Sequence, residues 1–291
     1  MGALLLHGVV DGVLDGGVYA LMAVGLSLIL GVMELLNLAQ AVFVIAGSYL
    51  SYVLEVHAGI DPFLGLLITM PVLFAVGAGL ERVFMRRITG RDKLIVALLV
   101  TYAVGEVILG ALNMIFGTNY IRLTASYVSS TFHAFGMYIP QVDVFGLGLA
   151  VLLIVALYAM LYGTRLGKSL RALIQNRTGA RLVGVDVERV SMIAFGVGVA
   201  LAAAGGMLFA TQPGGFTANS SEDLGSRLLA IVILGGLDSI EGALVGSMAM
   251  LILEDVIAAV WSPLWATLVF YVVLVLVMSF RPRGLFGRLA Y

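Results

Sequence analysis

The chain has 291 residues, of which 61% are hydrophobic and 11% are charged, and its mean hydropathy is +1.09. A soluble domain is about half apolar and about a quarter charged, so lipid must surround much of this chain. The net charge of −1 gives no reason to expect nucleic acid as a partner, and the absence of cysteine excludes disulfides and cysteine nucleophiles.

Eight apolar runs of membrane-spanning length follow one another along the chain, separated by polar or charged stretches. They lie at about 16–36, 39–56, 62–84, 94–116, 144–163, 189–211, 228–257 and 264–280. Backbone groups in hydrocarbon must be hydrogen-bonded within their own segment, so each run predicts helical structure. Residues 1–10 lack the basic segment of a cleavable signal peptide. The sequence therefore predicts an all-α, polytopic membrane protein with a single transmembrane domain over residues 1–291.

The basic residues predict the orientation. Three clusters of five, six and three residues hold fourteen of the 16 lysines and arginines; they span 82–93, 165–189 and 281–288. The positive-inside rule assigns them to the cytoplasm, which places the N-terminus in the periplasm and the C-terminus in the cytoplasm of a bacterial inner membrane. Arg122 and Arg227 then fall in outer segments. An odd number of crossings must follow residue 227, although only two apolar runs remain.

The number of crossings after residue 227 becomes odd if the run at 228–257 is broken into two helices. It is about 30 residues long and is interrupted at 235–242 by glycines and acidic residues. We expect two short helices that enter the membrane and return, joined at this break. Non-helical backbone at membrane depth is tolerated only where it is buried in protein or lines a wet cavity. The break therefore supplies the first candidates for a translocation pathway: Gly235, Gly236, Asp238, Ser239 and Glu241.

Other polar residues inside apolar runs are further pathway candidates. Asn37 and Gln40 interrupt the first two spans and predict a second, symmetric break. Glu106 lies in the middle of its run, on one helical face with Tyr102 and Asn113. Charges inside a membrane are costly and mark functional sites by default, so we expect this stripe to face the bundle interior. The alternative for Glu106 is a structural hydrogen bond or a protonated packing residue.

Two other patterns concern packing and the membrane interface. Small residues recur at helix-packing spacing, as in Gly12-xxx-Gly16 and Gly242-xxx-Gly246, and predict close contacts between helices. Glu254, near the end of its apolar run, is expected at the membrane interface.

No pattern predicts an enzyme. The stretch Gly163-Thr-Arg-Leu-Gly167-Lys168-Ser169 superficially resembles a phosphate-binding loop, but it has three residues between its glycines instead of four. The histidines, His7, His57 and His133, lack the spacing of metal ligands. We therefore predict no catalytic site, no metal and no cofactor bound by this chain, so any ATP would be hydrolysed on a partner subunit.

Residues 164–188 form the most informative segment. From Lys168 to Asn176 the pattern predicts a short amphipathic helix on the cytoplasmic surface. Its apolar face carries Leu170, Leu173 and Ile174, and its polar face carries Lys168, Arg171 and Gln175. Asp186 is predicted to cap the next membrane helix. Two interpretations stay open: a surface on which a motor subunit pushes, or a basic loop held at the lipid headgroups.

The same segment carries a resemblance. Arg165-x-Gly167-Lys168-xx-Arg171-Ala172-xxx-Asn176-xxx-Ala180-x-Leu182-x-Gly184-Val185-xxx-Arg189-Val190 resembles the cytoplasmic signature of LivH-type permeases of branched-chain amino acid ABC importers. Leu234-Gly235-Gly236-Leu237-x-Ser239-Ile240-x-Gly242 and the ending Arg281-Pro282-x-Gly284-Leu285-Phe286-Gly287 are also similar to that family. Tyr19-Ala20-Leu21-x-Ala23-x-Gly25-Leu26 and Asn37-Leu38-Ala39 are similar as well, so the matching motifs run from residue 16 to residue 288.

The resemblance implies partners and a coupling site. Such a permease pairs with a second permease subunit, related or identical, with two cytoplasmic ATPase subunits and with a periplasmic solute-binding protein. The segment 164–188 would dock on an ATPase through Gly167, Lys168, Arg171, Ala172, Asn176, Ala180, Gly184 and Arg189. The outer loops at 117–143 and 212–227 would receive the binding protein.

The sequence departs from the family pattern at the predicted pathway. Gln40-Ala41 stands where the family usually has a His-Gly pair, Asp238 and Glu241 stand where it usually has Gly and Pro, and the position of Glu106 is typically uncharged. The resemblance implies a branched-chain amino acid as the solute, and these departures favour the alternative of another small polar solute such as an amide, urea or other amino acid. An ion-coupled secondary transporter that uses Glu106, and a noncatalytic membrane scaffold, are the other classes considered.

Overall fold

The computed structural model describes residues 1–88, 92–124, 130–134, 137–212, 214–237, 239–281 and 284–287. In chain order the elements are α1 (Gly2–Met33), α2 (Gln40–Ala58), α3 (Pro62–Val83), η1 (Met85–Arg87), α4 (Lys93–Phe116), β1 (Thr131–Ala134), β2 (Met137–Pro140), α5 (Gln141–Gly163), α6 (Arg165–Gln175), α7 (Arg177–Leu182), α8 (Val187–Ala210), α9 (Ser220–Gly235), α10 (Ile240–Val260) and α11 (Pro263–Phe280). Within the described ranges, eight of the helices are long and apolar enough to cross a membrane: α1 to α5, α8, α10 and α11. The predicted all-α, polytopic fold is confirmed.

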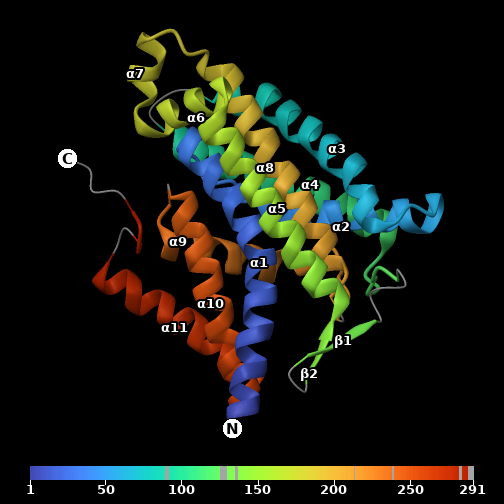
Figure 1. Ribbon diagram of the computed structural model, residues 1–291. Coiled ribbons are helices and arrows are strands. Elements are labelled where there is room, and N and C mark those ends of the chain that lie inside the picture. The colour runs from blue at the N-terminus through green and yellow to red at the C-terminus, as the bar shows by residue number, and fades with distance from the viewer. Residues whose placement is uncertain are drawn as a thin grey trace.

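The centre of the bundle is built by α1 and α8, which pack against α10, α2 and α3 (Figure 1). Close approach at these contacts requires glycine. A β-carbon on Gly12 would collide with the backbone of Ile252 in α10, and one on Gly206 would collide with the carbonyl of Val44 in α2. The close packing predicted from small residues is confirmed at these contacts. Because lipid gives no hydrophobic driving force between helices, dispersion between closely packed atoms stabilises them.

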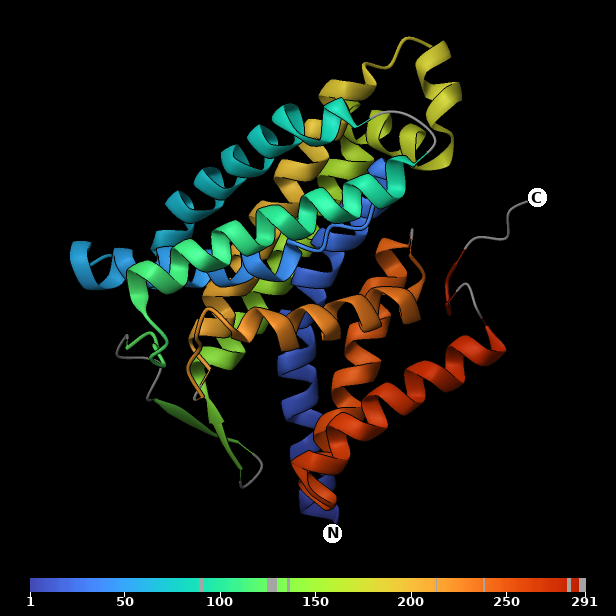
Figure 2. The ribbon, with the colours of Figure 1, turned by 180° about the vertical axis from the view of Figure 1, so that it is seen from behind.

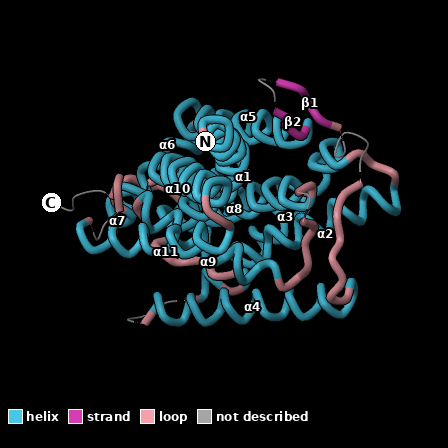
Figure 3. The backbone as a smooth tube through the Cα atoms, turned by 90° about the horizontal axis from the view of Figure 1, so that it is seen from below, coloured by secondary structure: helices cyan, strands magenta, loops and turns pink. Residues whose placement is uncertain are grey.

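The peripheral helices α4 and α11 contrast with this centre. Figure 2 shows both on the rear side of the bundle, and Figure 3 shows α4 along one edge. Within α4 the buried side is a narrow stripe of Ala97, Thr101, Gly105 and Leu109, and the remaining positions are exposed or half-buried. A helix that is apolar on all sides must meet lipid or another protein chain.

The first helix is longer than its apolar run predicts, because α1 begins at Gly2 and not near residue 16. Its first half contains Asp11 and Asp15, which end the apolar run but not the helix. The Asp15 carboxylate accepts a hydrogen bond from the Gln212 side chain at 3.1 Å, so this part of α1 has a polar partner inside the protein.

The predicted break in the run 228–257 is confirmed between α9 and α10, at residues 236–239. The expected lengths are wrong for α10, which has 21 residues and is not short, and the start of α9 lies at Ser220, before the apolar run. Arg227 therefore lies within α9 and not in an outer loop. It can do so because Glu254 of α10 and Asp223 accept its hydrogen bonds at 2.6 and 2.9 Å. Glu254 is accordingly a buried ion-pair partner, with 9% of its side chain exposed, and not the interfacial residue expected.

The helices around the second break run between the two ends of the bundle. The junction of α9 and α10 lies at the end of the bundle that carries α6 and α7, α10 runs back along α1 toward the N-terminus, and α11 returns (Figures 1 and 2). Of the helices after residue 220, α10 and α11 are long and apolar enough to cross a membrane, whereas α9, with 16 residues, is not among the candidate spans. The β1–β2 hairpin lies at the other end of the bundle (Figure 1).

Candidate coupling and translocation site

The predicted amphipathic helix is α6, and side-chain caps define its ends. The Thr164 hydroxyl accepts a hydrogen bond from the Gly167 amide at 3.0 Å at its start. The Asn176 side chain accepts one from the Gly179 amide at 2.8 Å, which ends α6 and begins α7. Such caps satisfy amides that a helix terminus otherwise leaves unpaired. The two helices are therefore separate units joined at Asn176.

The apolar face of α6 is buried as predicted, since Leu170 and Leu173 are fully covered by the bundle. A β-carbon on Gly167 would collide with the backbone carbonyl of Met160, so α6 crosses the end of α5 in direct backbone contact. The predicted cap of α8 is also confirmed: the Asp186 carboxylate accepts from the Arg189 amide at 3.0 Å.

The structure brings the residues predicted to couple to an ATPase together at this end of the bundle. Gly167 and Ala180 are buried, Arg171 and Ala172 are half-buried, and Lys168, Asn176, Gly184 and Arg189 are exposed. Sequence reasoning missed the apolar tip of α7, where Leu182 and Val183 are 84% and 80% exposed. The resemblance motif includes Leu182, but an exposed position cannot be told from a buried one by its residue type.

Arg177 connects this segment to the core and was also missed. Its Nη1 donates to the carbonyl oxygens of Val32 and Met33, at 3.3 and 3.4 Å, at the C-terminal end of α1. Burial lowers the pKa of Arg177 and the nearby Glu34 carboxylate opposes this. A cation at the C-terminus of a helix also interacts favourably with the helix dipole. The result is a direct link from α7 to the end of α1.

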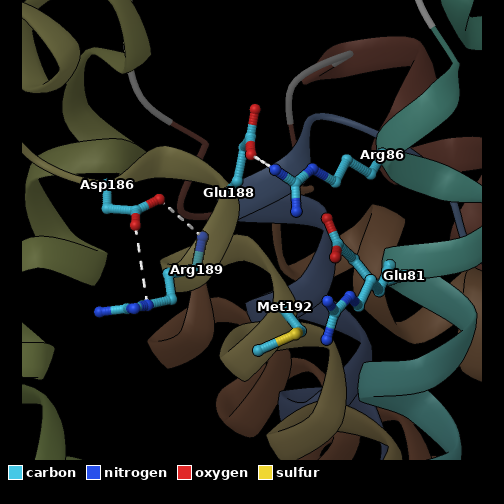
Figure 4. Close-up of a pocket in the computed structure, with 7 residues that line it drawn as sticks. Glu81, Arg86, Asp186, Glu188, Arg189 and Met192 are labelled. Carbon is cyan, nitrogen blue, oxygen red and sulfur yellow. Dashed lines mark hydrogen bonds and ion pairs between the residues drawn. The ribbon is translucent and has the colours of Figure 1, made fainter.

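A second link joins η1, directly after α3, to α8 beside a surface pocket of about 300 Å³. Figure 4 shows Arg86 of η1 and Glu188 of α8 pointing toward each other as an ion pair. Arg189 turns back to Asp186 in the same view, and Glu81 and Met192 line the wall. The first two basic clusters of the sequence therefore meet at one end of the bundle.

The first predicted break is confirmed between α1 and α2, at residues 34–39. Glu34 adopts a left-handed conformation with φ 57°, which ends α1. The Asn37 amide donates to Gln40 Oε1 at 3.2 Å, and Gln40 Nε2 donates to the carbonyl of Gly198 in α8, also at 3.2 Å. Both residues are 2% exposed. In this conformation they lock the break to α8 and do not line an open passage.

The second predicted break is held mainly by backbone. Gly236 has φ 113°, and Ser239 caps α10 by accepting from the Gly242 amide at 2.9 Å. The C-terminal segment 284–287 covers the end of α9, because the Leu285 and Phe286 amides donate to the carbonyls of residues 234 and 235 at 2.8 and 3.0 Å. Gly235 and Gly236 are buried, whereas Asp238 lies outside the described residues. The sequence motif at the C-terminus did not indicate this contact.

Glu241 lies at the start of α10 and lines a cavity of about 180 Å³ together with Arg171 of α6. The Arg171 guanidinium carbon lies 4.4 Å from the centre of the Tyr162 ring. A residue predicted for the pathway and one predicted for ATPase coupling therefore share one cavity.

The expectation that Glu106 faces the interior of the bundle is wrong for this chain. Glu106 and Tyr102 lie on the exposed side of α4. The buried stripe of α4 is shifted by one position and contains Gly105. Asn113 of the same face donates to the Asn219 side chain at 3.2 Å, so this face is directed toward α9. An exposed carboxylate in the middle of a membrane helix indicates a surface that lipid does not cover.

The described residues contain no group of histidine, aspartate or glutamate side chains arranged to hold a metal ion. The arrangement thus consists of two helix breaks, one end of the bundle at which basic clusters meet, and an exposed polar helix face. This is the construction of a multi-pass membrane permease.

Comparison with known proteins identifies which permease family it is. The sequence model of the family "Branched-chain amino acid transport system / permease component" matches residues 8–278, so the chain belongs to that family. The high-affinity branched-chain amino acid permease LivH of Escherichia coli K12 is 28% identical, covering 96% of this chain and 94% of its own. BraD of Pseudomonas aeruginosa is 27% identical, with 97% and 96% covered. A probable LivH of Methanocaldococcus jannaschii is 29% identical, with 92% and 88% covered.

Proposed function

We propose that this chain is one of two permease subunits that together form the translocation pathway of an ATP-driven importer of amino acids, with branched-chain amino acids as the expected solutes. The chain itself hydrolyses nothing, and ATP is bound by two partner subunits in the cytoplasm. A periplasmic binding protein delivers the solute to the outer end, where the N-terminus lies.

One observation carries this proposal: the α6–α7 segment is exposed on one side and attached to the bundle on the other, so it can transmit a force from a partner to the core. Its apolar side is buried, its tip exposes Leu182 and Val183, and Arg177 ties it to the end of α1 at 3.3 and 3.4 Å. A partner that binds the exposed side and moves α7 must displace the end of α1. The Asn37–Gln40–Gly198 hydrogen bonds pass that displacement on to α8.

The exposed face of α4 supports a second permease subunit as a partner. A carboxylate such as Glu106 is costly in hydrocarbon, but it is stable against a protein surface or in a watery passage between two subunits. We place the passage along this face, where α4 and α9 flank the first break. Asn37, Gln40 and the glycines of the second break then control the passage by moving helices, while Glu106 lines it.

Reconstitution tests the proposal. The chain, its partner permease, the two ATPases and the binding protein are assembled in proteoliposomes, and leucine uptake is measured with and without ATP. We expect ATP-dependent uptake by the complete assembly and none by the chain alone. Uptake by the chain alone, driven by an ion gradient, would establish the secondary transporter instead. ATP-dependent uptake of an amide or urea but not of leucine would change only the solute.

The docking assignment is tested by Arg171→Glu. The charge reversal is expected to abolish coupled uptake while the variant still folds and inserts, because Arg171 is only half-buried at the end of the bundle. Lys168→Gln, an exposed site on the same helix, is the milder companion variant. Unchanged uptake with Arg171→Glu would contradict the assignment.

A further inference from the structure

The cavity of about 180 Å³ beside α6 has no role in the passage described above. Its walls come from α5, α6, the start of α10 and the C-terminal segment: Tyr158, Leu161, Tyr162, Arg171, Ile174, Gln175, Ser239, Ile240, Glu241 and Phe286. Pockets for drug-sized ligands measure about 300–1,000 Å³, so this one suits a smaller molecule.

The two charged residues in the walls have spare binding capacity. Arg171 Nε is buried and has no hydrogen-bond partner among the described residues. Glu241 is exposed to the cavity, and in the described part of the chain no ion pair joins it to Arg171 or to any other cation. One positive and one negative group therefore face the same space without neutralising each other.

This combination defines the chemistry of a ligand. A guanidinium binds a carboxylate through parallel hydrogen bonds, and a carboxylate accepts hydrogen bonds from an ammonium group. The remaining wall is mostly apolar or aromatic, with Leu161, Ile240 and Phe286 among its residues. A small molecule with a carboxylate, an ammonium group and an apolar side chain satisfies all three parts of the wall.

We propose that this cavity binds a free zwitterionic amino acid with an apolar side chain from the cytoplasm and thereby slows the importer when its product accumulates. The regulatory part rests on the proposed function, which makes this amino acid the transported product. A bound ligand joins Arg171 on α6 to Glu241 at the second break. Because transport requires these elements to move, a ligand that favours one arrangement of them opposes the cycle.

Binding is tested on the full-length chain in lipid nanodiscs by isothermal titration. Leucine is expected to bind saturably, whereas 3-methylbutylamine, which lacks the carboxylate, and 4-methylpentanoate, which lacks the ammonium group, bind about tenfold more weakly or not at all. Glu241→Gln should weaken leucine binding about tenfold, the loss of one charge-assisted hydrogen bond. Tyr158→Trp, which fills part of the cavity, should weaken it as well.

Two matched variants locate the binding site. Asp92→Asn removes an exposed carboxylate that does not line the cavity and should leave leucine binding unchanged. Glu106→Gln alters the proposed passage, so comparing it with Glu241→Gln distinguishes the passage from the cavity as the place where leucine binds. Binding that is lost with Glu106→Gln but kept with Glu241→Gln and Tyr158→Trp would overturn the proposal, and so would the absence of saturable binding.

Inhibition is tested on the complete importer in proteoliposomes loaded with ATP and unlabelled leucine. The initial rate of labelled leucine uptake should fall severalfold as luminal leucine rises, and Glu241→Gln should remove this dependence. If uptake is ATP-driven but insensitive to luminal leucine, the regulatory inference fails and the proposed function stands. If there is no ATP-driven uptake, the proposed function fails, while the titration still decides whether the cavity binds an amino acid.

Discussion

The two helix breaks of this permease satisfy their free polar groups in different ways. The first break, at residues 34–39, is closed by side chains: Asn37 and Gln40 are buried and bond to each other and to α8. The second, at residues 236–239, is closed by backbone, with a glycine at φ 113° and amides of the C-terminal segment as partners.

The difference indicates different mobility. The first break lies in the core and can move only together with α8, since separating them would leave buried amide groups unpaired. The second is covered by a short chain segment, which can be released without opening the core. We therefore infer that the first break transmits force through the bundle and that the second is an adjustable joint beside α6.

The largest effect is expected from Gly236→Val. A side chain at φ 113° is strained, and its β-carbon would lie 2.7 Å from the amide nitrogen of Gly287. Strain and collision together should lower the free energy of unfolding by about 3 kcal/mol. The thermal unfolding midpoint in detergent measures this. Gly110→Val is the control, because no atom lies within 4 Å of a β-carbon there. Equal destabilisation by both variants would show that the joint is not tightly built.

Gln40→Leu should come next, with a loss of about 2 kcal/mol in the free energy of unfolding. It leaves the Asn37 amide and the Gly198 carbonyl buried without their partner. Gln141→Leu, at the start of α5 and only half-buried, is the matched control and should change stability by less than about 0.5 kcal/mol. Hydrogen exchange at residues 233–237 should stay unchanged in Gln40→Leu if the two breaks are independent.

A chain that ends at Arg281 should be destabilised by about 1–2 kcal/mol, because two backbone hydrogen bonds to the end of α9 are lost. Hydrogen exchange should rise locally around residues 233–237 and not around the first break. A global increase in exchange would contradict the view that the C-terminal segment covers a local joint.

The smallest effect is expected from Glu188→Gln, which breaks the ion pair with Arg86 without touching either break. Their side chains are 53% and 47% exposed, so the pair should contribute about 0–1 kcal/mol. The difference from the unmodified chain should disappear in about 1 M salt, where exposed charges are screened. A larger or salt-resistant effect would mean that the η1–α8 link is part of the core.

Several features of this protein were predictable from the sequence because they depend on local chemistry. Long apolar runs in lipid have to be helical, and polar amides or paired glycines inside such runs mark breaks, so both breaks were predicted. The alternation of apolar and basic residues predicted the buried face of α6, and Asp186 predicted a cap. The length of α1 was not predictable, because Asp11 and Asp15 end the apolar run and the partner of Asp15 comes from residue 212.

Sequence alone thus determined the class of fold, the number of membrane-spanning helices and the positions of both breaks, since each follows from composition and spacing within one segment. Only the tertiary structure decided that Arg227 pairs with Glu254, that Glu106 faces outward, that Arg177 reaches the end of α1 and that Arg171 and Glu241 share a cavity. These facts depend on which helices become neighbours. A charged side chain is stable or costly in a membrane according to partners that lie tens of residues away along the chain.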